Sequence, residues 1–272
     1  ICKLAKKSLR RIATKVDPYV ETRPGFAFAM DSIAWNSSHG PVISRHGNIY
    51  TYVLRCIACG YFCAVHVWQK DDITEELHDV ITEIRTDPRF KCSEYVLMTE
   101  IHLDLAGEQS DVNQVFQSML KDVGVIPYYS SPHDKRSAAH AENAVKIIEM
   151  HAKCIMMERM LPLEYWEEAV DAAIYISNVV ALARDVKSTD GDAPRPIERI
   201  SFGRVSRRQY DHMIHHFQTP GTLCLVPTPK VQGSNIAMPA RQRWGVVIRM
   251  LGSMPVFECP FLRTTFRSKD YR

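Results

Sequence analysis

Three carboxylates stand at positions where an acid could take part in chemistry. Asp31 falls within the first expected strand, Asp104 follows a buried strand, and Glu142 lies in the first turns of a long expected helix. Phosphodiester cleavage or transfer at neutral pH is slow because nucleophile and leaving oxygen are both poor, and two divalent cations can assist both. Mg²⁺ prefers oxygen ligands, so carboxylates from separate elements suit it. The chain has 31 acidic residues, so this spacing alone is a weak indication.

The elements that must position these acids follow the order β-β-β-α-β-α-β-α-α, with a β-rich tail. Alternating and continuous apolar runs predict strands, and longer periodic runs with capping residues predict helices. The expected strands cover 26–35, 50–57, 61–68, 94–103 and 125–129, and the expected helices cover 72–84 (capped by Asp72), 110–123, 137–160 and 163–180. Short connections between the first three strands and helical connections afterwards predict an α/β fold with a mixed sheet.

Charge is distributed unevenly along the chain, although the net charge is only +3. Residues 1–23 carry seven Lys or Arg against two acids, and residues 200–272 carry eleven against three. Two basic flanks around an acidic middle favour a polyanionic partner over a chance clustering of surface charge.

Composition excludes several other classes of protein. Hydrophobic content of 46% fits a folded globular chain. The longest apolar run, 57–68, is 12 residues long, too short to span a bilayer, and we expect no membrane partner. The eight cysteines are irregularly spaced, which favours free thiols in a reducing compartment over a disulfide framework.

Four motifs in order resemble the integrase of copia-type retrotransposons. Asp104-Leu-Ala-Gly-Glu108 is similar to that family's Asp-Asn-Gly-Gly-Glu segment, and 37 residues separate Asp104 from Glu142. Ser131-Pro132 followed by Ala-Glu142-Asn is similar to its Ser-Pro…Ala-Glu segment. Leu161-Pro-Leu-Glu-Tyr-Trp-Glu-Glu-Ala, with a later Ala-Ala and Asn178, resembles its helix pair, and Cys2-Lys-Leu-Ala-Lys-Lys resembles the end of its zinc segment.

The resemblance implies an RNase H-like mixed five-stranded sheet flanked by helices, followed by a small β-rich, SH3-like module. We expect 1–23 to be a basic linker that ends a truncated upstream zinc module. The catalytic core would span 24–182, a linker 183–200 and the basic β-rich module 201–272. The chain would therefore be a piece of a longer polyprotein.

The resemblance also implies a catalytic triad of Asp31, Asp104 and Glu142 that holds two Mg²⁺ or Mn²⁺ ions. The site would cleave DNA near its 3′ end and transfer the strand into target DNA. Phosphates of double-stranded DNA would contact five basic residues: Lys135, Arg136, Lys146, Arg207 and Arg208. Self-association, and a nuclear location after a cytoplasmic particle stage, would follow.

Some alternatives stay open at this point. The loop Gln of the family is missing, and Ala138-Ala139 replaces its Asn-Gly, so the chain could be a catalytically decayed integrase that only binds nucleic acid. Lys146 could form a surface i,i+4 pair with Glu142, and His102 is expected to be packed or solvated. Zinc-ligand spacing is found at Cys56, Cys59, Cys63 and His66. Alternate strand residues point to opposite faces, however, so we expect no Zn²⁺ within this fragment.

Overall fold

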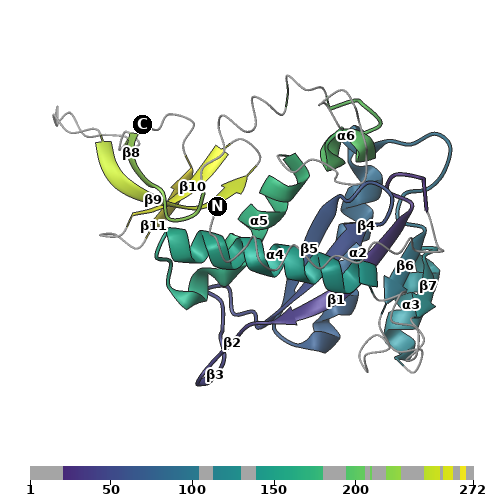
Figure 1. Ribbon diagram of the computed structural model, residues 1–272, viewed down its shortest axis with the longest axis horizontal. Helices are drawn as coiled ribbons and strands as arrows, with labels where there is room; N and C mark the ends of the chain where they lie inside the picture. The colour runs from purple at the N-terminus through teal and green to yellow at the C-terminus, as the bar shows by residue number, and fades with distance from the viewer. Residues whose placement is uncertain are drawn as a thin grey trace, which may run out of the picture.

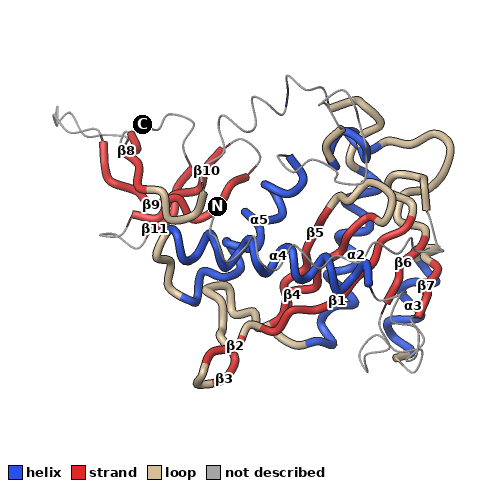
Figure 2. The backbone as a smooth tube through the Cα atoms, in the orientation of Figure 1, coloured by secondary structure: helices blue, strands red, loops and turns tan. Residues whose placement is uncertain are grey.

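The computed structural model describes residues 21–103, 113–129, 139–179, 194–205, 209, 219–227, 242–251, 254–259 and 264–267 (Figures 1 and 2). The strands of the N-terminal part are β1 (Ala27–Ala34), β2 (Asn36–Ser37), β3 (Gly40–Pro41), β4 (Tyr50–Cys56), β5 (Phe62–Val67), β6 (Glu100–Leu103) and β7 (Ile126–Tyr129). The helices are α2 (Ile73–Thr86), α3 (Gln114–Asp122), α4 (Ala139–Glu158), α5 (Trp166–Val179) and α6 (Pro196–Ile200).

One five-stranded sheet organises this part of the chain, in the order β5-β4-β1-β6-β7. β1 pairs antiparallel with β4, and β4 antiparallel with β5, whereas β1, β6 and β7 run parallel. The expected mixed sheet is therefore confirmed. β1 is a central strand, and residues 27–30 are completely buried, as expected for a strand that is covered on both faces.

Helices cover both faces of the sheet (Figure 1). α2 and α3 cover one face, with buried residues such as Leu77 and Phe116 packed against Phe28 and Met30 in one core. α4 and α5 cover the other face, where Ala144, Ile148 and Ala173 form a second core with Ile33 and Val53. Because side chains alternate along a strand, β1 supplies both cores and separates them.

The two helices on the second face, α4 and α5, differ in the residues that they bury. α4 turns small residues toward the sheet, including Ala141, Ala144 and Ala152, which lets the helix approach β1 and β4 closely. α5 is buried along most of its length, including Trp166 and Asn178. Their connection contains a 3-10 turn, Leu163–Tyr165, after Pro162.

The structure differs from the sequence-based expectation at three places. The expected strand 94–103 is shortened to Glu100–Leu103, because Leu97 and Met98 are buried from a loop in which Met98 has φ +52°. Asp72 precedes α2, but its carboxylate accepts from the backbone N–H of Gln69 instead of capping α2.

The third difference concerns the expected linker 183–200. Its described end contains helix α6, whose Ile197 and Ile200 are buried in the first core. Val205, beyond the expected boundary at 201, belongs to the same core. Apolar residues of α6 and Val205 therefore attach this segment to the first core.

The tail forms a separate four-stranded antiparallel sheet in the order β11-β10-β9-β8, as the β-like runs predicted. Its strands are β8 (Leu223–Pro227), β9 (Gln242–Leu251), β10 (Met254–Cys259) and β11 (Thr264–Arg267). Gly221 has φ +86°, and an added Cβ would lie only 3.0 Å from Leu161 Cδ2.

No helix in the described part of the chain is long and apolar enough to cross a bilayer.

Candidate functional site

Asp31 lies in the second half of β1, on the face covered by α4. It shares this face with Ile33 two residues later and lies opposite Val53 of β4, and both of these residues belong to the α4–α5 core. The carboxyl group is half-buried, and its Oδ1 accepts a hydrogen bond of 2.7 Å from the backbone N–H of Ser32. A central strand thus holds this carboxylate at a rigid position.

The parallel pairing of β1 with β6 relates Asp31 to the second predicted acid, Asp104. Met30 is the register partner of Leu103, the last residue of β6. Asp104 follows Leu103 directly in the chain and itself lies outside the described residues. Asp31 follows Met30 in the same way, so the two acids follow a matched pair of adjacent parallel strands. Ligands of open α/β sheets bind beyond the carboxyl ends of such strands.

Glu142 lies in the first turn of α4, the helix that covers the Asp31 face. Its side chain is exposed, between the buried Ala141 and Ala144, and the N-terminal end of a helix stabilises a negative charge. Lys146 lies one turn further on, with its Nζ 3.2 Å from Glu142 Oε2. The surface pair that the sequence left open for Lys146 is therefore present in the structure.

The remaining predicted contacts with DNA cannot be placed in the same way. Lys135, Arg136, Arg207 and Arg208 lie outside the described residues. They stay predictions, as does the role of Lys146 in contacting a phosphate.

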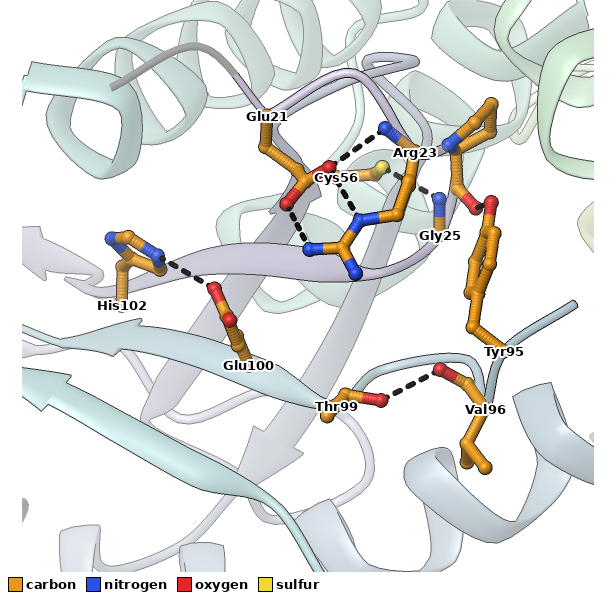
Figure 3. A network of polar contacts seen from close by, with 10 residues as sticks. Glu21, Arg23, Gly25, Cys56, Tyr95, Val96, Thr99, Glu100 and His102 are labelled. Carbon is orange, nitrogen blue, oxygen red and sulfur yellow. Dashed lines mark hydrogen bonds and ion pairs between the residues drawn. The ribbon is translucent and has the colours of Figure 1, made fainter. Parts of the chain in front are cut away.

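Two polar residues of β6, Glu100 and His102, lie close together (Figure 3), and Glu100 was not among the residues that the sequence singled out. Glu100 and His102 share one strand face, and His102 Nε2 lies 3.9 Å from Glu100 Oε2. The His102 ring stacks on Tyr128 of β7, with ring centroids 5.2 Å apart. His102 is therefore packed, as expected. The period-two spacing Glu100-His102-Asp104 was the sequence signal that could have identified Glu100.

The entry to β1 is held by a carboxylate–guanidinium clamp, also visible in Figure 3. Glu21 accepts from the side chain of Arg23 through both carboxylate oxygens, and this lowers the pKa of Glu21 to about 2. The Arg23 guanidinium lies 3.2 Å from the centroid of the Phe26 ring. This clamp fixes the chain immediately before the strand that carries Asp31.

The four residues with zinc-ligand spacing do not converge. Cys63 packs toward the α2–α3 core, with Val65 and Val67, whereas His66 contacts Trp166 on the opposite face of β5. Both ring nitrogens of His66 are engaged, Nδ1 with Thr51 Oγ1 at 2.9 Å and Nε2 with Asp171 Oδ1 at 3.1 Å. Burial raises the pKa of Cys63, which disfavours the thiolate that zinc requires.

Within the described ranges, no three His, Cys, Asp or Glu side chains lie close enough together to hold a metal ion. The chemistry of the predicted triad nevertheless suits Mg²⁺, because all its donors are carboxylate oxygens. Asp31 and Glu142 belong to two elements that pack against each other, β1 and α4.

No protein-family model and no curated protein matches this sequence. Among solved structures, one match is a chain of the cryoEM structure of the simian T-cell lymphotropic virus intasome in complex with the PP2A regulatory subunit B56 gamma. It is 12% identical over 93% of this chain and 81% of that chain, with a TM-score of 0.50. This chain shares the fold of that matched chain.

A second match is the HTLV-2 integrase catalytic core domain in complex with magnesium, in a trimeric form. It is 12% identical over 60% of this chain and 91% of that chain, with a TM-score of 0.42. The sequence identity to the first match is low, so that comparison contributes the fold alone.

Proposed function

We propose that this chain is a copia-type retrotransposon integrase, a polynucleotidyl transferase that cleaves DNA near its 3′ end and transfers the strand into target DNA. One observation carries the proposal. Asp31 follows the register pair Met30–Leu103 in β1, Asp104 follows it in β6, and α4, which carries Glu142, packs on the same sheet face. Carboxylates contributed by three neighbouring elements would suit metal-assisted phosphoryl transfer.

Each acid has a defined role in this proposal. Two divalent cations, Mg²⁺ or Mn²⁺, would lower the pKa of the attacking group and neutralise charge on the leaving oxygen. Asp31 would contact both ions, Asp104 one and Glu142 the other. In the first step, water attacks a phosphodiester near the DNA end and the 3′-oxygen leaves as a free hydroxyl. In the second step, that 3′-hydroxyl attacks a phosphodiester of the target DNA, the target's own 3′-oxygen leaves, and the two strands are joined. Both steps are in-line displacements without a covalent enzyme intermediate.

The basic residues would bind the DNA backbone without reading its sequence. Lys146 projects from α4 one turn beyond Glu142, and 71% of its side chain is exposed, so it can exchange its carboxylate partner for a phosphate. Lys135, Arg136, Arg207 and Arg208 complete the proposed DNA contacts. We also propose self-association on DNA and a nuclear site of action after a cytoplasmic particle stage.

Strand cutting and joining on a short labelled duplex tests the proposal. The full chain is assayed with Mg²⁺ or Mn²⁺ and compared with Asp31→Asn, Asp104→Asn and Glu142→Gln. Exposed acids remote from the sheet edge provide the matched control, for example Asp79→Asn. We expect the metal-dependent activity to fall to background in each triad variant and to persist in the control.

Two results would contradict this function. Activity that survives loss of Asp31 would reject the triad. A wild-type chain that binds duplex DNA with a strong salt dependence but never cuts would favour the decayed, nucleic-acid-binding alternative.

A further inference from the structure

A groove beside α2 and α3 contains none of the residues assigned to the proposed DNA chemistry. It lies between the start of α2 and the outer face of α3, beside the end of β5, and encloses about 830 Å³. Helices α2 and α3 pack on the sheet face opposite α4, the helix that carries Glu142.

The groove has an apolar strip that solvent reaches. Trp68, just after β5, is 44% exposed, and Val115 of α3 is 70% exposed. Met119 lies one helical turn beyond Val115 and lines the same groove, which continues along α3 into a smaller hollow of about 600 Å³. Contiguous exposed apolar groups beside a concave surface are typical of a contact site.

The rim of the groove is acidic. Asp71, Asp72, Glu75 and Glu76 all line it and are exposed, and its described lining contains no Lys or Arg. Arg85, the basic residue of α2, points inward and donates to the carbonyl groups of Leu97, Met98 and Val123. The α2 dipole favours acids in the first turn, but it does not account for the exposed Trp68 and Val115 beside them.

We infer that this groove is a docking surface for a Lys- and Arg-rich peptide segment of a partner protein. Carboxylates on the rim attract the cationic groups, and the Trp68 ring offers a face to one of them. The aliphatic stems of such residues, or apolar residues between them, fit the Val115–Met119 strip. A nucleic acid would be repelled by the same rim, which leaves this face accessible while DNA is bound elsewhere.

Fluorescence anisotropy with two labelled nonapeptides tests the inference on the full chain. One peptide alternates Lys and Leu, and the other alternates Glu and Leu. We expect the Lys-Leu peptide to bind and the Glu-Leu peptide not to bind. Glu75→Gln/Glu76→Gln should weaken the Lys-Leu peptide about fivefold to tenfold at low salt, and much less at high salt.

Two further variants separate charge from apolar contact. Val115→Ser should weaken binding about threefold to tenfold with the salt dependence unchanged. The matched control, Glu94→Gln/Glu164→Gln, removes two exposed carboxylates outside the groove lining and should leave affinity unchanged.

Several results of these measurements would overturn the inference. Equal binding of both peptides, or equal loss in the groove and control variants, would show general charge attraction without a site. Full affinity in both groove variants would place the peptide elsewhere. Duplex DNA binding, measured in parallel, should be unchanged or slightly stronger in Glu75→Gln/Glu76→Gln, and a loss there would assign the groove to DNA.

Discussion

The amide of Asn178 holds the edge strand β5 to helix α5, and its removal is expected to weaken the whole core. Its Oδ1 accepts from the backbone N–H of Phe62 and its Nδ2 donates to the carbonyl of Phe62, both at 2.7 Å. β5 is an edge strand, so these two backbone groups have no neighbouring strand on their outer side. Asn178 is buried, and the amide therefore replaces the missing strand.

Asn178→Ala leaves a buried donor and a buried acceptor without partners, at a cost of about 1–3 kcal/mol for each group. We expect the free energy of unfolding to fall by about 3 kcal/mol, because an opened edge admits some water to the freed groups. Asn178→Asp should also destabilise, since a carboxylate can accept from the N–H of Phe62 but repels its carbonyl.

Urea unfolding followed by tryptophan fluorescence measures the change, and the midpoint should fall without a change in slope. Asn36→Ala is the matched control, because the Asn36 amide is exposed and makes a 3.4 Å contact with the carbonyl of Ala34. The reasoning is refuted if Asn178→Ala and Asn36→Ala have the same stability within about 0.5 kcal/mol.

Two further predictions concern the backbone and a half-buried histidine. Gly25→Ala should lower the free energy of unfolding, measured in urea, by about 2–4 kcal/mol, because φ is +76° and the new Cβ would lie 2.9 Å from Leu97 Cδ2. Gly47 has φ +91° but open space around the position of a Cβ, so Gly47→Ala should cost only about 1 kcal/mol. Equal losses in the two variants would contradict the packing argument. Burial lowers the pKa of His66, but the Asp171 carboxylate raises it by more, to above its ordinary 6.5. The resulting stabilisation is complete below pH 6.5 and is lost as pH rises through the folded-state pKa, so stability should decline as pH rises above 6.5. Asp171→Asn should flatten that decline in a pH series of unfolding curves, and an unchanged slope would reject the His66–Asp171 pair as its source.

Much of the sheet could be predicted from the sequence, because its signals were local. The runs around Phe28 and Val53 are continuous and apolar, as strands buried on both faces require, and Gly60 marks the turn between β4 and β5 with φ +74°. The repeated spacing Ile73, Leu77, Ile81 and Ile84 gave α2.

Other features depend on contacts that no local pattern reveals. The run at Leu97 and Met98 is as apolar as a strand, but its backbone pairs with the start of β1, where Met98 N–H donates to the carbonyl of Gly25. Helix α6 has only five residues, and its burial depends on a core built by segments far away in the chain. Polar composition around such a short helix predicted a linker instead.

The structure shows which segments the motif residues at the start of α5 contact. Trp166 stacks on Trp35 with centroids 5.5 Å apart, and its Nε1 donates to the carbonyl of Val42. Glu167 accepts from Ser44 and Asn48, so the first turn of α5 holds the segment between β3 and β4. These motif residues therefore fasten distant segments to the scaffold.

The same distinction explains why the site was harder to predict than the scaffold. Asp31 could be placed because its strand is fixed on both sides by β4 and β6, and the register of β1 with β6 then brings the chain to Asp104. Glu142 depends instead on where α4 begins, and its side chain is paired with Lys146. A carboxylate on a central strand is positioned before any ligand binds, whereas one at an exposed helix start can change rotamer and partner.

If the proposed function is correct, metal and DNA must draw Glu142 away from Lys146, so Lys146→Met should weaken DNA binding without weakening metal-dependent cleavage of DNA already bound.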